Sequence, residues 1–226
     1  MSLALGGNQI EHYDWGKSMR LFVALELNSK AITNLTDLVR RLRPYAPLRW
    51  VNPQNMHVTL KYVGDWHANR LDELIHNLSE VQLPASEPVL SVPLAGLGFF
   101  PNARSPRVFW AGAENTTALR QLHSRVDSAL QPLGIAPEVR PYQPHLTLAR
   151  ITDDILLDDL YRAIEDLPTR EFGLINPDQF VLFESSVTAS GPIYRKVAEF
   201  TFVPQGGETA SPAATQPSRS FFVTRY

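Results

Sequence analysis

The chain has 226 residues, of which 44% are hydrophobic and 19% charged, with a formal net charge of −2 and no cysteine. This is the composition of a globular protein that can bury a substantial core, and it excludes disulfide bonds, thiolate nucleophiles and cysteine-ligated zinc. The small net charge argues against a surface that coats nucleic acid nonspecifically, because such binding needs many Lys and Arg side chains, but it leaves a single phosphate or a strand end as a ligand.

The first half of the chain is predicted to alternate between strands and helices. Residues 1–18 show no periodicity and contain two adjacent glycines, so we expect a flexible extension. Apolar runs and helically spaced apolar residues then predict strands over 19–27 and 56–63, helices over 30–43 and 67–81, and strands over 87–100 and 107–113. A turn-rich linker joins the last two strands, which favours antiparallel pairing.

A similar order of elements follows in the second half. It consists of a helix over 116–131, a strand over 144–151, a helix over 154–166 and strands over 171–186 and 192–203. Residues 204–226 are rich in Gly, Ser, Pro, Thr and Ala and are expected to be a disordered tail. We therefore expect an α+β protein in which residues 19–203 form one domain of two similar lobes.

The sequence predicts neither a transmembrane segment nor a secretion signal. Apolar runs stay below the roughly 20 residues that a membrane span requires, and the first residues lack the basic and apolar regions of a secretion signal. A cytoplasmic location is therefore expected.

Two copies of one tetrad carry the candidate chemistry, His57-Val58-Thr59-Leu60 and His145-Leu146-Thr147-Leu148. Each lies in a predicted strand, so its His and Thr share one face while the two apolar residues take the other. The histidines are 88 residues apart, which suggests matching strands in two halves of the fold. If the halves face each other, two imidazoles and two hydroxyls surround one small anion.

The alternatives are a structural role and a metal site. A single buried His beside a Thr is more often structural, and the other histidines, His12, His67, His76 and His123, are interpreted in that way. A zinc site built on the two tetrads is disfavoured because neither has the closely spaced second His or Glu of known zinc motifs.

Two longer segments resemble a known family. Residues 48–64 and 140–150, which contain the tetrads, resemble the two signature segments of the 2H phosphoesterases, in particular the RNA 2′,3′-cyclic phosphodiesterases once called 2′-5′ RNA ligases. The resemblance covers about residues 19–203. It implies a bilobal fold in which two pseudo-symmetric antiparallel sheets with flanking helices surround a central cleft, one tetrad per lobe, without a metal or other cofactor.

The resemblance also implies a reaction, the opening of RNA or nucleoside 2′,3′-cyclic phosphates to 2′-phosphates. This reaction needs a base for the attacking water, an acid for the leaving ribose oxygen and stabilisation of phosphoryl charge. By resemblance, His57 is the acid, His145 is the base, and Thr59 and Thr147 bind the phosphate. The expected partners are RNA ends or nucleotides with a cyclic phosphate, and the protein is expected to be a monomer.

The cation that contacts phosphate is a less direct prediction. The resemblance assigns this role to Arg150, but strict alternation would place Arg150 on the face opposite His145, so the strand must end or bulge there. Lys61 has the correct parity in the first tetrad strand and is a second candidate. Tyr142 and Phe22 are candidates to stack on a base.

Two alternative functions use the same residues. One is the joining of RNA ends through a 2′-5′ linkage, which microscopic reversibility assigns to the same site. The other is a non-catalytic module that binds RNA ends or nucleotides, although binding alone does not require two titratable groups.

Overall fold

The computed structural model describes residues 18–83, 89–152, 155–188 and 191–203. The predicted flexible extension and the predicted tail, 204–226, lie outside the described residues, except that Ser18 is already part of the first strand. None of the described helices combines the length and the apolar character that a membrane crossing requires.

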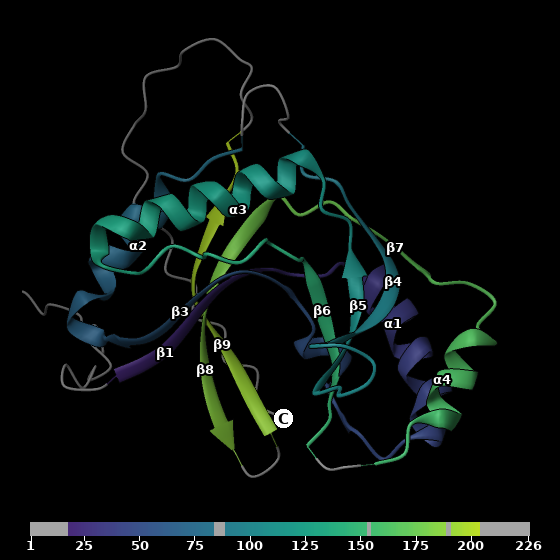
Figure 1. The fold of residues 1–226 in the computed structure, drawn as a ribbon. Coiled ribbons are helices and arrows are strands. Elements are labelled where there is room, and N and C mark those ends of the chain that lie inside the picture. Colours follow the sequence, from purple (N-terminus) through teal and green to yellow (C-terminus); the bar gives the residue numbers. More distant parts are fainter. Residues whose placement is uncertain (1–17, 84–88, 153–154, 189–190, 204–226) are drawn as a thin grey trace, which may run out of the picture.

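Two antiparallel sheets make up the fold (Figure 1). The first sheet, in the order β3-β1-β8-β9, contains β1 (Ser18–Leu25), β3 (Val58–His67), β8 (Gln179–Thr188) and β9 (Gly191–Thr201). The second sheet, in the order β2-β6-β5-β4-β7, contains β2 (Arg49–Trp50), β4 (Val92–Phe100), β5 (Val108–Ala113), β6 (His145–Arg150) and β7 (Glu171–Ile175). The predicted α+β class with two antiparallel sheets is thereby confirmed.

The described part of the chain contains four α-helices, and two of them lie on one side of each sheet. They are α1 (Ser29–Leu42), α2 (Leu71–Ser79), α3 (Thr117–Leu130) and α4 (Asp158–Glu165). Helices α2 and α3 pack together, with α3 against β3 and α2 against β9, whereas α1 packs against β7 and α4. The apolar stripe predicted for each helix forms this contact; in α1 it buries Leu35, Leu38, Val39 and Leu42.

The two lobes are interleaved along the chain, which corrects the expectation that they correspond to sequence halves. Helix α1 follows a strand of the first sheet but packs on the second, and α3 follows a strand of the second sheet but packs on the first. Strands β8 and β9 then return to the first sheet. Neither lobe can therefore form from one continuous half of the chain.

Some predicted boundaries were wrong for local reasons. The single strand predicted over 171–186 is two strands, β7 and β8, separated by Asn176-Pro177-Asp178; proline lacks the N–H that a continuous ladder needs. Strand β3 runs three residues past Gly64, which pairs with Leu21 at a φ of 89° that glycine tolerates. The two-residue strand β2 was not predicted.

A buried ion pair fixes α3 against β3. The ammonium group of Lys61 binds the carboxylate of Asp127 and donates a hydrogen bond to the carbonyl of Ala136 at 2.8 Å. The side chains of Lys61 and Asp127 are only 7% and 12% exposed. Water therefore stabilises neither charge well, and each charge is stabilised mainly by the other.

We predict that Lys61→Ala lowers the free energy of unfolding by about 3–5 kcal/mol, because it leaves the Asp127 carboxylate buried without its partner. Urea denaturation measures this change. The control is Arg20→Ala, which breaks a pair with Asp65 whose side chains are 52% and 67% exposed and should cost under about 1 kcal/mol. Equal losses in the two variants would contradict the prediction.

Candidate active site

A β-bulge in β6 places Arg150 beside its tetrad. Thr147 pairs with Trp110 of β5, and after the inserted residue Leu148 the pairing resumes so that Arg150 faces Val108. Trp110 and Val108 are two residues apart and share a face of the sheet, so Thr147 and Arg150 share it as well. We call this the tetrad face. The bulge that the sequence analysis required for Arg150 is therefore present.

A matching bulge in β3 has the opposite consequence for Lys61. Thr59 and Lys61 pair with consecutive residues of β1, so Leu60 is the inserted residue and Lys61 turns away from Thr59 toward α3. Lys61 is therefore not available to bind phosphate, and this candidate was wrong. Tyr62, the next residue, shares the face of Thr59 instead and is 56% exposed. We use the term tetrad face for this side of the first sheet too.

The two histidines are held by the same backbone contact. Nδ1 of His57 lies 2.9 Å from the carbonyl oxygen of Asn55, and Nδ1 of His145 lies 2.8 Å from that of Gln143. A carbonyl oxygen only accepts, so each Nδ1 carries a proton and donates it. Each ring therefore leaves Nε2 as the nitrogen that can give or take a proton.

Aromatic rings pack around His57. Its ring is 4.8 Å from that of Phe22 and 5.2 Å, edge to face, from that of Tyr194, and Phe183 stacks on Phe22 at 5.3 Å. Burial is the main cause that lowers the pKa of His57; the hydrogen bond to the Asn55 carbonyl opposes it in part, and the charge of His145 lowers the pKa by a smaller amount. The two imidazoles thus lie within electrostatic reach of each other.

One residue links the two tetrads directly. The hydroxyl of Tyr142, three residues before His145, donates to the carbonyl oxygen of Thr59 at 2.9 Å. Its ring stacks on that of His123 on α3, with centroids 3.9 Å apart. Tyr142 therefore joins the lobes, with His123 as its support. Phe22 is 5% exposed beneath His57 and offers no free face to a base, so this stacking candidate was wrong. Tyr142 has one ring face on His123 and lines the cavity described below, so its stacking role stays a prediction.

Arg150 is close to the other lobe as well. Burial raises the pKa of Tyr194, and the positive charge of Arg150 opposes that rise. Tyr194 contacts His57, so the positive charge of Arg150 acts on a residue of the first tetrad's surroundings. The tetrad strands β3 and β6 contact each other, so the predicted site residues of both tetrads lie near this contact.

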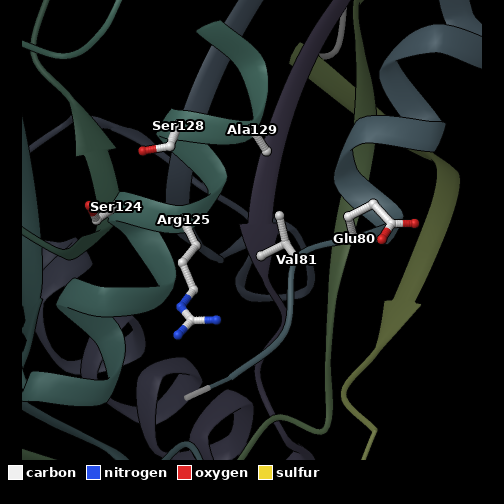
Figure 2. A pocket seen from close by; sticks show the side chains of 6 residues that line it. All are labelled: Glu80, Val81, Ser124, Arg125, Ser128 and Ala129. Atoms are coloured by element: carbon white, nitrogen blue, oxygen red, sulfur yellow. The ribbon is translucent and has the colours of Figure 1, made fainter. Parts of the chain in front are cut away.

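A cavity of about 340 Å³ lies beside His145, and no residue of the first tetrad lines it. Phe100, Trp110 and Tyr142 contribute to its lining. A larger hollow, about 400 Å³, lies between α3 and the residues that follow α2 (Figure 2), and Arg125 and Glu80 are among its lining residues. No tetrad residue lines this second hollow, so the larger cavity is not the candidate site.

The described ranges contain no group of three His, Asp or Glu side chains placed to hold a metal ion. His12 lies outside these ranges. His67 and His76 are exposed and do not line the cavity beside His145, whereas His123 supports Tyr142.

Sequence reasoning missed three aromatic residues of the site. Tyr62 occupies the place in the first tetrad strand that Arg150 has in the second, five residues after the histidine, so the internal repeat contained the signal that could have found it. Tyr194 and Trp110 reach the site from β9 and β5. No local pattern marks them, because strand order alone brings them there.

Comparison with known proteins agrees with this geometry. Residues 28–176 match the model of a family described as the 2′-5′ RNA ligase superfamily. The chain is 33% identical over 187 residues to the RNA 2′,3′-cyclic phosphodiesterase of Methanothermobacter thermautotrophicus, covering 80% of this chain and 98% of that protein. It is 30% identical over 192 residues to the enzyme of the same name from Thermotoga maritima, covering 84% and 97%.

Solved structures show the same fold. A crystal structure from Thermus thermophilus superposes with a TM-score of 0.70 at 26% identity, covering 83% of this chain and 100% of that chain. Escherichia coli LigT complexed with 3′-AMP superposes with a TM-score of 0.67 at 23% identity, covering 82% and 99%. At this identity the likeness to LigT concerns the fold alone.

We predict that Tyr142→Phe lowers the free energy of unfolding by about 1–2 kcal/mol, because the stacked ring remains but the Thr59 carbonyl loses its donor. Thermal or urea denaturation measures the loss. The control is Tyr161→Phe, which removes a 2.7 Å hydrogen bond to the Ala103 carbonyl at an exposed site, where water can replace the donor. If Tyr142→Phe is no more destabilising than this control, the bond between the lobes is not a stabilising one.

Proposed function

The chain belongs to the 2′-5′ RNA ligase superfamily, and on this premise we propose that it hydrolyses RNA and nucleoside 2′,3′-cyclic phosphates to 2′-phosphates. The observation that carries the proposal is the matched pair of imidazoles, His57 and His145, each oriented by a backbone carbonyl two residues earlier. His145 is the first residue of β6 and His57 directly precedes β3, and these two strands of different sheets contact each other. This supports the proposal that the two rings act as acid and base on opposite sides of one phosphorus.

The proposed reaction is an in-line displacement at phosphorus. Nε2 of His145 takes a proton from water, whose oxygen forms the new bond to phosphorus. The bond from phosphorus to the ribose 3′ oxygen breaks, and Nε2 of protonated His57 gives that oxygen its proton. The 2′ oxygen keeps the phosphate. Burial against Phe22 and Tyr194 favours neutral His57, so the protonated ring is a stronger acid than an exposed histidine.

Three further side chains stabilise the phosphoryl charge. The hydroxyls of Thr59 and Thr147 lie on the tetrad faces and donate to the nonbridging oxygens. Arg150 supplies the positive charge, which the bulge at Leu148 directs to the same face. Tyr62, exposed on the tetrad face of the first sheet, provides an aromatic surface on which the terminal nucleoside can stack.

This set of groups provides acid, base and charge stabilisation without a metal ion or other cofactor. We therefore propose a metal-independent enzyme, acting as a monomer in the cytoplasm on RNA ends or nucleotides that carry a cyclic phosphate. Joining of RNA ends uses the same groups, with a ribose 5′-hydroxyl in place of water and a 2′-5′ linkage as product. A binding module without turnover is the remaining alternative, and the assay below distinguishes it.

We predict that His57→Ala and His145→Ala each lower the rate of hydrolysis of adenosine 2′,3′-cyclic phosphate by about 10²–10⁴-fold, since each removes a proton-transfer group. Chromatography that separates 2′- from 3′-phosphate products measures both rate and regiochemistry. The control His76→Ala changes an exposed histidine on α2 and should retain the native rate, as should native protein in EDTA. Full activity in either tetrad variant would remove that histidine from the mechanism.

We also predict the titration of His57. Burial lowers the pKa of its imidazole, so in the free protein the ring should lose its proton below pH 6.5, the ordinary value for histidine.

With adenosine 2′-phosphate bound, the same titration should lie at higher pH, because the bound phosphate anion favours the imidazolium. NMR chemical shifts of the His57 ring, assigned with His57→Ala and followed between about pH 4.5 and 9, measure both titrations. A pKa of His57 clearly above 6.5 in the free protein would contradict the prediction.

A further inference from the structure

The cavity beside His145 is a compartment that the proposed phosphate site does not use. His145, the first residue of β6, lines this cavity. The residues that lead into β6, including Tyr142 and Gln143, line it as well. Thr147 and Arg150, further along the strand, do not line it. The phosphate-binding groups and the cavity are thus neighbours that share His145.

An indole ring forms the floor of this cavity. Trp110 pairs with Gly98 of β4, and a Cβ atom on Gly98 would lie 2.2–2.7 Å from three atoms of the six-membered ring of Trp110. The indole therefore occupies the space directly above Gly98, which any side chain larger than hydrogen would fill. Trp110 remains half-buried and lines the cavity, so part of its surface is open to an occupant.

The walls are aromatic and uncharged. The ring of Phe100 lies 5.2 Å from that of Trp110 and 4.9 Å, edge to face, from that of His145. Among the described residues, no Asp, Glu, Lys or Arg lines this cavity. A volume of about 340 Å³ is at the lower end of the range for small-molecule sites. These features suit a flat, uncharged heterocycle and not a second phosphate.

Two polar atoms of the lining residues have no hydrogen-bond partner among the described residues. They are Nε1 of Trp110, a donor, and Oδ1 of Asn115, an acceptor. Asn115 is held in place by its other amide atom, which donates to the Tyr142 carbonyl at 3.2 Å. Buried polar atoms are normally satisfied, and the edge of a nucleobase offers both acceptors and donors.

We propose that this cavity binds a second nucleoside, next to the nucleotide that carries the phosphate. The inference rests on the proposed function for the identity of the first nucleotide. The second base stacks on Trp110 against Phe100, and its nucleoside is either the preceding residue of the same RNA strand or the end of a separate strand. In the second case the nucleoside lies on the side of His145, from which the attacking oxygen comes.

Equilibrium binding tests the subsite without requiring turnover. Isothermal titration calorimetry compares adenosine 2′-phosphate, the dinucleotide that ends in the same 2′-phosphate, and a dinucleotide whose 5′ residue lacks its base. If the second nucleoside belongs to the same strand, the full dinucleotide should bind about tenfold more tightly than the mononucleotide, and removal of the base should abolish this gain. The abasic ligand controls for the additional phosphodiester charge.

A second titration covers the separate-strand case, with adenosine added to protein saturated with adenosine 2′-phosphate. If the dinucleotide has no advantage but adenosine binds under these conditions, the second nucleoside comes from another strand. If neither occurs, the proposal is overturned. If the native protein shows these binding differences but does not hydrolyse 2′,3′-cyclic phosphates, the proposed function is refuted and the proposed subsite is retained.

Variants of Trp110 test whether the indole binds the second base. Trp110→Leu should abolish the gain in affinity for the dinucleotide, or the binding of added adenosine, whichever the native protein shows. Trp110→Phe, which keeps a smaller ring, should retain part of it. The matched control is Phe99→Leu on β4, because Phe99 stacks on Phe109, on the opposite face of the same sheet, and should leave the gain unchanged. An undiminished gain in Trp110→Leu, or an equal loss of affinity for mononucleotide and dinucleotide, would overturn the proposal.

Discussion

The paired bulges in β3 and β6 are the constraint on which the site depends. A strand without a bulge would place residues two apart on one face, and Arg150 would then lie in the core. One inserted residue at Leu148 reverses the alternation, so that Arg150 joins Thr147 on the tetrad face. The equivalent insertion at Leu60 turns Lys61 inward to Asp127 and Tyr62 outward. The same backbone irregularity therefore places a cation on the tetrad face in one strand and forms a buried ion pair in the other.

The two histidines share a backbone device but differ in surroundings. Carbonyl oxygens fix the same nitrogen of each ring, which leaves Nε2 in both as the nitrogen that can give or take a proton. His57 then packs on the apolar cluster that contains Phe22 and Phe183, while His145 borders a cavity with Phe100 and Trp110. Similar motifs can take opposite roles in proton transfer because burial and neighbouring charge, not the motif itself, determine how readily each ring is protonated.

The interleaved topology explains how two separate sheets hold one site. Each sheet is covered by a helix that the chain reaches from the other sheet, so the lobes cannot separate without unfolding both. The hydroxyl of Tyr142 then ties the approach to the second tetrad to the backbone of the first. A proton-transfer mechanism with two groups needs such rigidity, since hydrogen-bond reach is only about 2.6–3.2 Å.

The sequence by itself determined the helices and most strands, because those features follow from periodicities of 3.6 and 2 residues that operate over short spans; it also placed His145 and Thr147 in one strand, whereas His57 directly precedes the strand that contains Thr59. Only the tertiary structure decided the fate of Lys61, whose partner Asp127 is 66 residues away, and of Tyr142, whose acceptor is 83 residues away. Strand order brought Trp110 and Tyr194 to the histidines in the same way. Bulges and strand order arise from the balance of packing between distant segments, and a local pattern contains no information about that balance.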